Sequence, residues 1–163
     1  MAKKFKAKLD RSLRENAAEL FPLLLKEVMS YKERVISHPE DAEALHQMRI
    51  AGRPMRYVME AFAPAFGKSY GKKLKELKNL LEIAGDVHDC DVMMGMLGKD
   101  VAPPEGAPQG LAAVGLPPRG MTALLEAERN RRNAMYSKLC DTLASWDARK
   151  FRDALARTLE KGT

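Results

Sequence analysis

The chain has 163 residues, of which 45% are hydrophobic and 31% charged, which is typical of one globular domain and excludes a disordered chain. Its net charge of +6 points to an anionic partner such as nucleic acid, polyphosphate or an acidic surface. Two cysteines are too few for a disulfide framework, and no run approaches the roughly 20 apolar residues of a membrane span. The first residues carry charges and no apolar core, so we expect no signal peptide and a cytoplasmic protein.

Apolar residues recur at helical spacing through most of the chain, and no run alternates as a strand would, so we predict an all-α fold. A first helix is expected over residues 10–36, where Pro22 should bend it or delay its start. A second helix is expected over residues 38–62. Its start is predicted from Ser37 as N-cap, with Glu40 completing a capping box.

The helical pattern continues in the second half of the chain. Gly85 and the acidic segment after it should end one helix and start another, capped by Asp86 or Asp89. Asp147 should cap the last helix. The helices of this half are expected over residues 70–84, 87–97, 122–145 and 147–159.

Residues 99–120 are rich in proline and glycine and predict a long flexible loop within one domain that spans residues 1–163. The other connections are short. Long helices joined by short turns favour an antiparallel four-helix bundle with an additional short C-terminal helix.

The second predicted helix carries cations along the edge of its apolar seam. Its apolar residues recur every three or four positions, and His46, Arg49, Arg53 and Arg56 follow the same rhythm one residue later. They form one strip with Glu60 as the only carboxylate in register. A row of cations about 5 Å apart repels itself unless an anion neutralises it, and guanidinium groups bind phosphate oxygens bidentately. A solvated face, paired with carboxylates of a neighbouring helix, is the alternative interpretation.

Two other predicted helices carry similar strips. Lysines step by three along KKLKELK, and arginines share one face of RNRRNAMYSKL. If these strips meet the first one, they line a basic groove for a polyanion. The residues concerned are Lys72, Lys75, Lys78, Arg129 and Arg132.

The segment GDVHDCDV contains residue types that bind metals, namely His88, Asp89 and Cys90. Together with His46 and Asp141, the His88–Asp89 pair follows the order H…HD…D of the HD phosphohydrolases, so a metal-dependent phosphohydrolase is an alternative function. Helix capping or pairing with arginines explains the acidic residues more simply. Because no Gly-rich phosphate loop, nucleophile elbow or CxxC pair is present, we expect no catalytic residue, metal or cofactor.

The stretches LHQMRIAGRPMRYVMEAF and LKELKNLLEIAGDVHDCDV resemble the CHAD family, the conserved-histidine α-helical domains. The family pattern is H-x-x-R-x-x-x-[KR]-x-x-R-Y, followed by a leucine-rich helix that ends in G-x-x-x-D-x-x-V. The first motif is filled by His46, Arg49, Arg53, Arg56 and Tyr57. The second is filled by Lys78, Gly85, Asp89 and Val92, and the resemblance spans about residues 10–160.

This resemblance implies a helical, non-enzymatic module that binds inorganic polyphosphate through a basic groove, in some members at polyphosphate granules. It implies ligand contacts by the first-motif residues and Lys78, with Arg129 and Arg132 less directly matched. Lys72 and Lys75 are added from helical geometry. Nucleic-acid binding is a further alternative, but the strips hold no aromatic platform for stacking bases.

The chain departs from the family pattern in three ways. Pro54 stands where an ordinary helix residue is usual, and His88 stands where Arg or Asn is commoner. The usual domain also holds two bundles, each with its own H-x-x-R helix, whereas this sequence has one such helix. We therefore expect a homodimer that recreates the double bundle, and no membrane partner.

Overall fold

The computed structural model describes residues 10–101 and 119–160, and within these ranges the chain is helical without any strand. The all-α prediction is therefore confirmed, whereas the finer expectation of a regular antiparallel four-helix bundle stays a prediction. Most of the loop predicted over 99–120 lies outside the described residues. The helices are α1 (Leu13–Ser30), α2 (Lys32–Ser37), α3 (Ala42–Phe62), a 3₁₀ turn (Ala63–Ala65), α4 (Lys68–Val101), α5 (Arg119–Ser145) and α6 (Ala148–Glu160).

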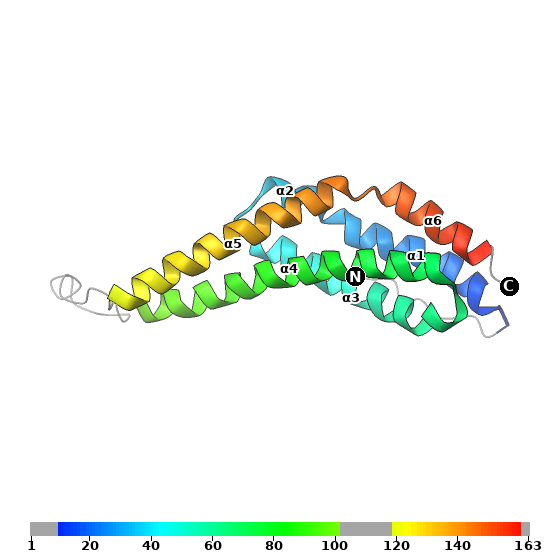
Figure 1. The fold of residues 1–163 in the computed structure, drawn as a ribbon, viewed down its shortest axis with the longest axis horizontal. Coiled ribbons are helices and arrows are strands. Elements are labelled where there is room, and N and C mark those ends of the chain that lie inside the picture. Colours follow the sequence, from blue (N-terminus) through cyan, green and yellow to red (C-terminus); the bar gives the residue numbers. More distant parts are fainter. Residues whose placement is uncertain (1–9, 102–118, 161–163) are drawn as a thin grey trace.

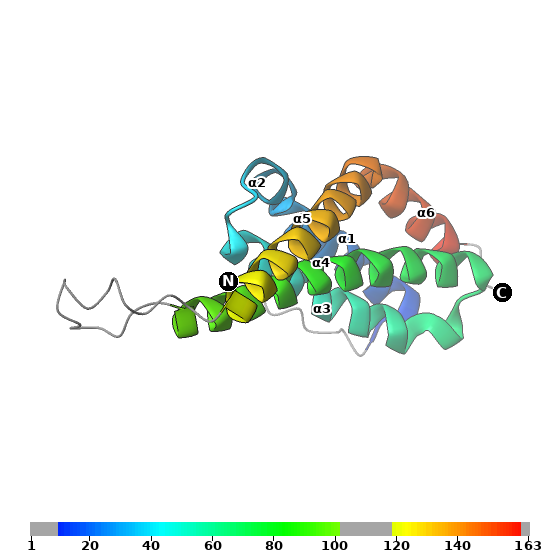
Figure 2. The ribbon, with the colours of Figure 1, turned by 60° about the vertical axis from the view of Figure 1, so that its left-hand side comes forward.

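Helix α4 is the central element of the arrangement (Figure 1). It forms a long hairpin with α5, and it also packs against α3 and α6. Helix α1 packs against α3 and α6 and completes the other end of the core. The α4–α5 hairpin projects beyond the remaining helices, as both ribbon views show (Figures 1 and 2). None of the described helices is long and apolar enough to span a bilayer.

The core between these helices is rich in methionine and leucine. Met48, Met55 and Met59 of α3 are fully buried, which confirms the seam predicted from the apolar spacing. They belong to the same buried cluster as leucines of α4. Tyr70 is also fully buried, and its hydroxyl donates to the carbonyl of Met59 at 3.0 Å, so the one polar atom of this ring has a partner. Burial raises the pKa of Tyr70, which therefore stays neutral.

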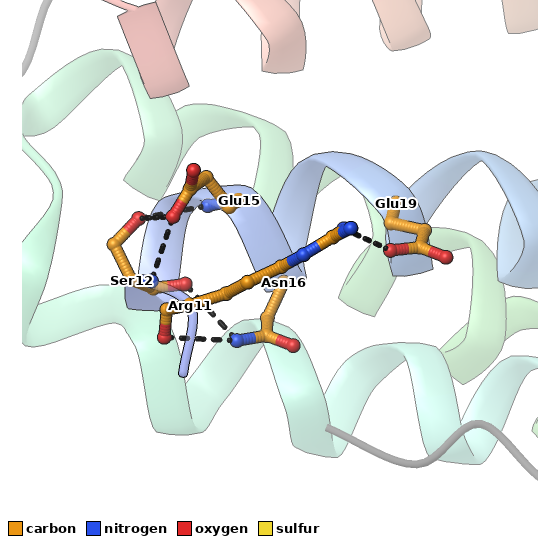
Figure 3. A network of polar contacts seen from close by, with 5 residues as sticks. All are labelled: Arg11, Ser12, Glu15, Asn16 and Glu19. Carbon is orange, nitrogen blue, oxygen red and sulfur yellow. Dashed lines mark hydrogen bonds and ion pairs between the residues drawn. The ribbon is translucent and has the colours of Figure 1, made fainter. Parts of the chain in front are cut away.

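The start of α1 shows how local side chains fix a helix end (Figure 3). Ser12 is the N-cap: its hydroxyl accepts from the Glu15 amide, and the Glu15 carboxylate accepts from the Ser12 amide at 2.7 Å. Asn16 donates to the Arg11 and Ser12 carbonyls, and Arg11 pairs with Glu19. Hydrogen bonds from Ser12 lower the pKa of Glu15, so the Glu15 carboxylate keeps its charge at neutral pH.

Two of the predicted helix boundaries near the N-terminus are wrong. The helix expected over 10–36 is divided at Tyr31 into α1 and α2, while Pro22 lies inside α1 without ending it. Ser37 is the last residue of α2 and donates to Glu33, so it caps nothing. Asp41 is the N-cap of α3 and accepts from the Ala44 amide at 2.9 Å. Asp41 supplies the cap because it directly precedes Ala42, the first residue of α3, and its negative charge also interacts favourably with the helix N-terminus.

The break predicted at Gly85 is also wrong, because α4 is continuous from Lys68 to Val101. Asp86 and Asp89 therefore lie inside a helix and cap nothing. One glycine costs a helix about 1 kcal/mol, and the packing of α4 against α3 and α5 offsets that cost. The predicted cap of the last helix is confirmed, since Asp147 accepts from the amides of Arg149 and Lys150.

The close approach of α3 and α4 at Gly52 should be sensitive to any added side chain. A Cβ at this position would lie 2.3 Å from Leu81 Cδ2 and 3.3 Å from its Cγ, so rotating one methyl group does not clear the space. We predict that Gly52→Val lowers the free energy of unfolding by about 1–3 kcal/mol in urea titrations. Adding Leu81→Ala should restore part of the loss.

The matched control is Gly71→Val, because Gly71 is also in a helix but a Cβ there meets nothing within 4 Å. If both valine variants lose the same stability, helix propensity rather than the α3–α4 approach explains the effect.

Candidate functional site

The cation strip of α3 faces α4 in an antiparallel register. The ring of His46 stacks on that of His88, with centroids 4.9 Å apart and an interplanar angle of 27°. One helical turn along, the Arg49 guanidinium lies over Gly85, where a Cβ would be 3.6 Å from Nη2. Near the other end of the strip, Lys78 Nζ pairs with Glu60 at 2.7 Å. The predicted strip therefore lies along the α3–α4 seam, where His46, Arg49 and Arg56 are partly buried and Arg53 is exposed.

A small polar cavity opens on this seam. Its volume is about 240 Å³, and no carboxylate is among the residues that line it. The Arg56 guanidinium lies 4.8 Å from the centroid of the Tyr57 ring, a cation–π contact that holds this guanidinium beside the cavity. The lining residues are Arg49, Arg53, Arg56, Tyr57 and Leu81. Three guanidinium groups around one hollow form a cradle for an anion with several oxygens.

The arginines of the strip are only partly neutralised within the described residues. Burial lowers the pKa of Arg49, the charge of Asp89 raises it, and the neighbouring Arg53 lowers it again. No ion pair within 4.0 Å includes Arg49 or Arg53 in the described part of the chain. An external anion would supply the charge that this pair of guanidinium groups lacks.

Glu60 ends the strip and connects the two helices. Its carboxylate is 4.0 Å from Arg56 Nε and 2.7 Å from Lys78 Nζ. The hydrogen bond from Lys78 is the main reason that the pKa of Glu60 is lowered. Lys78 is thereby brought to the strip, as expected. Lys72 and Lys75 lie nearer the start of α4, are exposed, and make no contact with the arginines that the structure records.

The α5 arginines belong to a different hollow. Arg129 and Arg132 line a space of about 540 Å³ between α4 and α5, together with Asp91 and Glu40. Arg132 pairs with Asp91, and its side chain is only 12% exposed. It also donates to the Pro39 carbonyl at 2.6 Å. Of the three strips expected to converge, the α3 strip meets the α4 lysine strip at Lys78. Arg132 of the α5 strip instead holds α4, α5 and the α2–α3 turn together.

His88 is the residue of this seam that the predicted site did not include. Its stacking on His46 depends on the α3–α4 register, which the spacing within one helix does not contain. In each ring Nδ1 is buried without a hydrogen-bond partner. A contact of this kind could have been found only by aligning the two motifs in antiparallel order.

The metal alternative gains no support from the described residues, where no three His, Cys, Asp or Glu side chains are grouped so as to hold an ion. Burial and then a hydrogen bond with Glu128 raise the pKa of Cys90 to about 11. This buried thiol is therefore protonated at neutral pH.

Comparison with known proteins identifies one similarity. A family model described as CHAD domain matches residues 1–98, which include both the α3 strip and its α4 partner. No curated protein and no solved structure is similar enough to this chain to count as a match.

The two α5 arginines should differ sharply on substitution. Arg132→Ala leaves Asp91 in a nearly buried site without a partner and should lower the free energy of unfolding by about 3 kcal/mol. Arg129→Ala removes an exposed charge of the same hollow and should change it by less than about 0.5 kcal/mol. Urea unfolding followed by circular dichroism measures both. Equal stability of the two variants would contradict a structural role for Arg132.

Proposed function

This chain belongs to the CHAD family, and from that premise we propose that it is a non-catalytic module that binds inorganic polyphosphate along the α3–α4 seam. The observation that carries the proposal is the cavity lined by Arg49, Arg53 and Arg56, with no carboxylate in its wall. Bidentate guanidinium groups match the tetrahedral oxygens of phosphate, and they keep their charge at any physiological pH.

A linear polymer suits this site better than a single phosphate. Arg49 and Arg56 are seven residues apart on one helix, which corresponds to about 10 Å along the axis at a rise of about 1.5 Å per residue. The strip continues to His46 at one end and to Lys78 at the other, so successive phosphate groups can contact successive side chains. We also propose a cytoplasmic location at polyphosphate granules.

The same face offers little to a nucleic acid beyond its backbone. Tyr57 is the one aromatic residue in the cavity wall, and its ring already lies against the Arg56 guanidinium. Single-stranded nucleic acids are usually held by several aromatic side chains on which bases stack. We therefore expect polyphosphate to compete effectively with RNA or DNA for this site.

We further propose that the protein works as a homodimer. The resemblance implies a domain with two bundles, and this chain has one cation helix of the matching motif. Ile50 and Tyr57 leave apolar surface exposed beside the strip, 43% and 55% of each residue, and a second copy would cover it. Two seams facing a shared groove would double the cationic surface that the polymer meets.

Removing strip arginines should weaken binding without unfolding the protein. We expect Arg49→Ala and Arg53→Ala each to lower the affinity for long-chain polyphosphate about tenfold, because each removes a charge-assisted phosphate contact. Each should also reduce the slope of log affinity against log salt by about one. Fluorescence anisotropy with end-labelled polyphosphate, at several salt concentrations, measures both quantities.

Arg157→Ala is the matched control, because Arg157 is an exposed arginine of α6 away from the seam. A decrease of the same size in this variant would mean that net charge, not the seam, determines binding. Assays for phosphate release from polyphosphate, run in parallel with added Mg²⁺ or Mn²⁺, should give no turnover; release would favour the phosphohydrolase alternative instead.

The homodimer can be tested separately from polyphosphate binding. Sedimentation equilibrium should give twice the mass of one chain at micromolar concentration, and Ile50→Glu should shift the protein to the monomer, because a buried charge opposes association. Monomer mass for the wild-type chain at every concentration would rule the homodimer out and leave the polyphosphate site of one chain untouched.

A further inference from the structure

Two of the three histidines of the chain meet at the end of the arginine strip. His46 comes from α3 and His88 from α4, and their rings are stacked with centroids 4.9 Å apart. Arg49 is the next cation along α3 and lies over Gly85, one turn before His88 on α4. The histidine pair therefore continues the row of groups that can donate hydrogen bonds to an anion.

The surroundings of His88 favour a neutral ring in the free protein. Nδ1 of each ring is buried without a hydrogen-bond partner. An imidazolium carries N–H groups on both nitrogens, and a buried N–H without an acceptor is costly, whereas a buried lone pair costs less. The neutral form of His88, with its proton on Nε2, is therefore favoured.

Burial and the cations around His88 also favour its neutral form. Burial, then Arg49 and His46 of α3, lower the pKa of His88 below its ordinary value of 6.5. Asp89 and Asp91 of α4 oppose this shift, but Asp91 is paired with Arg132 of α5. The free protein thus holds His88 uncharged at neutral pH, beside a strip whose arginines are permanently cationic.

We propose that His46 and His88 form a phosphate-binding subsite at the end of the arginine strip, and that a phosphate group enters it together with one proton taken up by His88. This inference rests on the proposed polyphosphate function and adds to it a second histidine, which the family motif does not contain. An anion beside the pair accepts the Nε2–H of His88. The proton taken up goes to the buried Nδ1, and the negative charge of the anion offsets the cost of that additional N–H.

The sign of the pH dependence follows from this linkage. The bound complex holds His88 with a higher pKa than the free protein does, so affinity rises as pH falls through the pKa of the complex and levels off below that of the free protein. Each proton taken up changes the affinity by up to about tenfold per pH unit. Protonation of terminal phosphates, whose second pKa is about 6, would weaken binding as pH falls. The two effects have opposite signs.

Isothermal titration calorimetry with long-chain polyphosphate at pH 7, in two buffers of different ionisation enthalpy, counts the protons taken up. The wild-type protein should take up a measurable fraction of a proton, up to about one per subsite, and should bind more tightly at pH 6 than at pH 8. His88→Asn keeps a hydrogen-bond donor but does not titrate, and it should lose the uptake and flatten the pH dependence. His38→Asn, a variant of the exposed third histidine at the end of α2, should behave as wild type.

A measurement without any variant guards against misfolding of His88→Asn. The imidazole C2–H resonance of His88 in the wild-type protein should titrate at higher pH when polyphosphate is bound than when it is absent. Binding without proton uptake, equal uptake in His88→Asn and wild type, or an unchanged His88 titration would each overturn the subsite while leaving the polyphosphate function intact. Absence of polyphosphate binding at every pH would overturn both.

Discussion

The approach of α3 to α4 at Gly52 is the constraint on which the rest of the seam depends. The absence of a side chain at this position lets Leu81 lie against the α3 backbone, and the two helices then continue in antiparallel register on either side. In one direction the register places Arg49 over Gly85 and His46 on His88. In the other it brings Arg56 and Lys78 to the same carboxylate of Glu60. A shift of α4 by one residue would turn Gly85, His88 and Lys78 away from their α3 partners.

Two kinds of arginine in this chain show how charge can serve structure or binding. Arg132 is nearly buried, paired with Asp91 and bonded to a backbone carbonyl, so its hydrogen-bonding capacity is used within the fold. Arg53 is exposed, and Arg49 is half-buried among other cations with Asp89 as its nearest compensating charge. The second arrangement is unfavourable in the free protein and becomes favourable when an anion enters, which is what a binding surface requires.

Much of the fold and of the site could be predicted because both follow from spacing within one helix. The apolar seam of α3 and the cation strip one residue later differ by about 100° of rotation, and that difference survives in the structure. The predicted break at Gly85 fails because packing along the whole of α4 outweighs a local preference. The Ser37 cap fails because Ser37 still belongs to α2, whereas Asp41 directly precedes the first residue of α3. The His46–His88 pair could not be predicted, since it depends on a register between two helices that no single periodicity contains.

The cation-lined α3–α4 seam and the helix that supports it follow one another in chain order. The family model ends at residue 98, and every residue of the α3–α4 seam lies before that point. Helix α5 lies beyond it and holds α4 and α2 in place, through Arg132 on Asp91 and through the Tyr136 hydroxyl, which donates to the carbonyl of Val35 at 2.6 Å. Because these bonds connect α5 to both α4 and α2, Arg132 serves the structure of the fold. The match to the family model thus covers the α3–α4 seam and ends before α5, the helix that holds α4 in place.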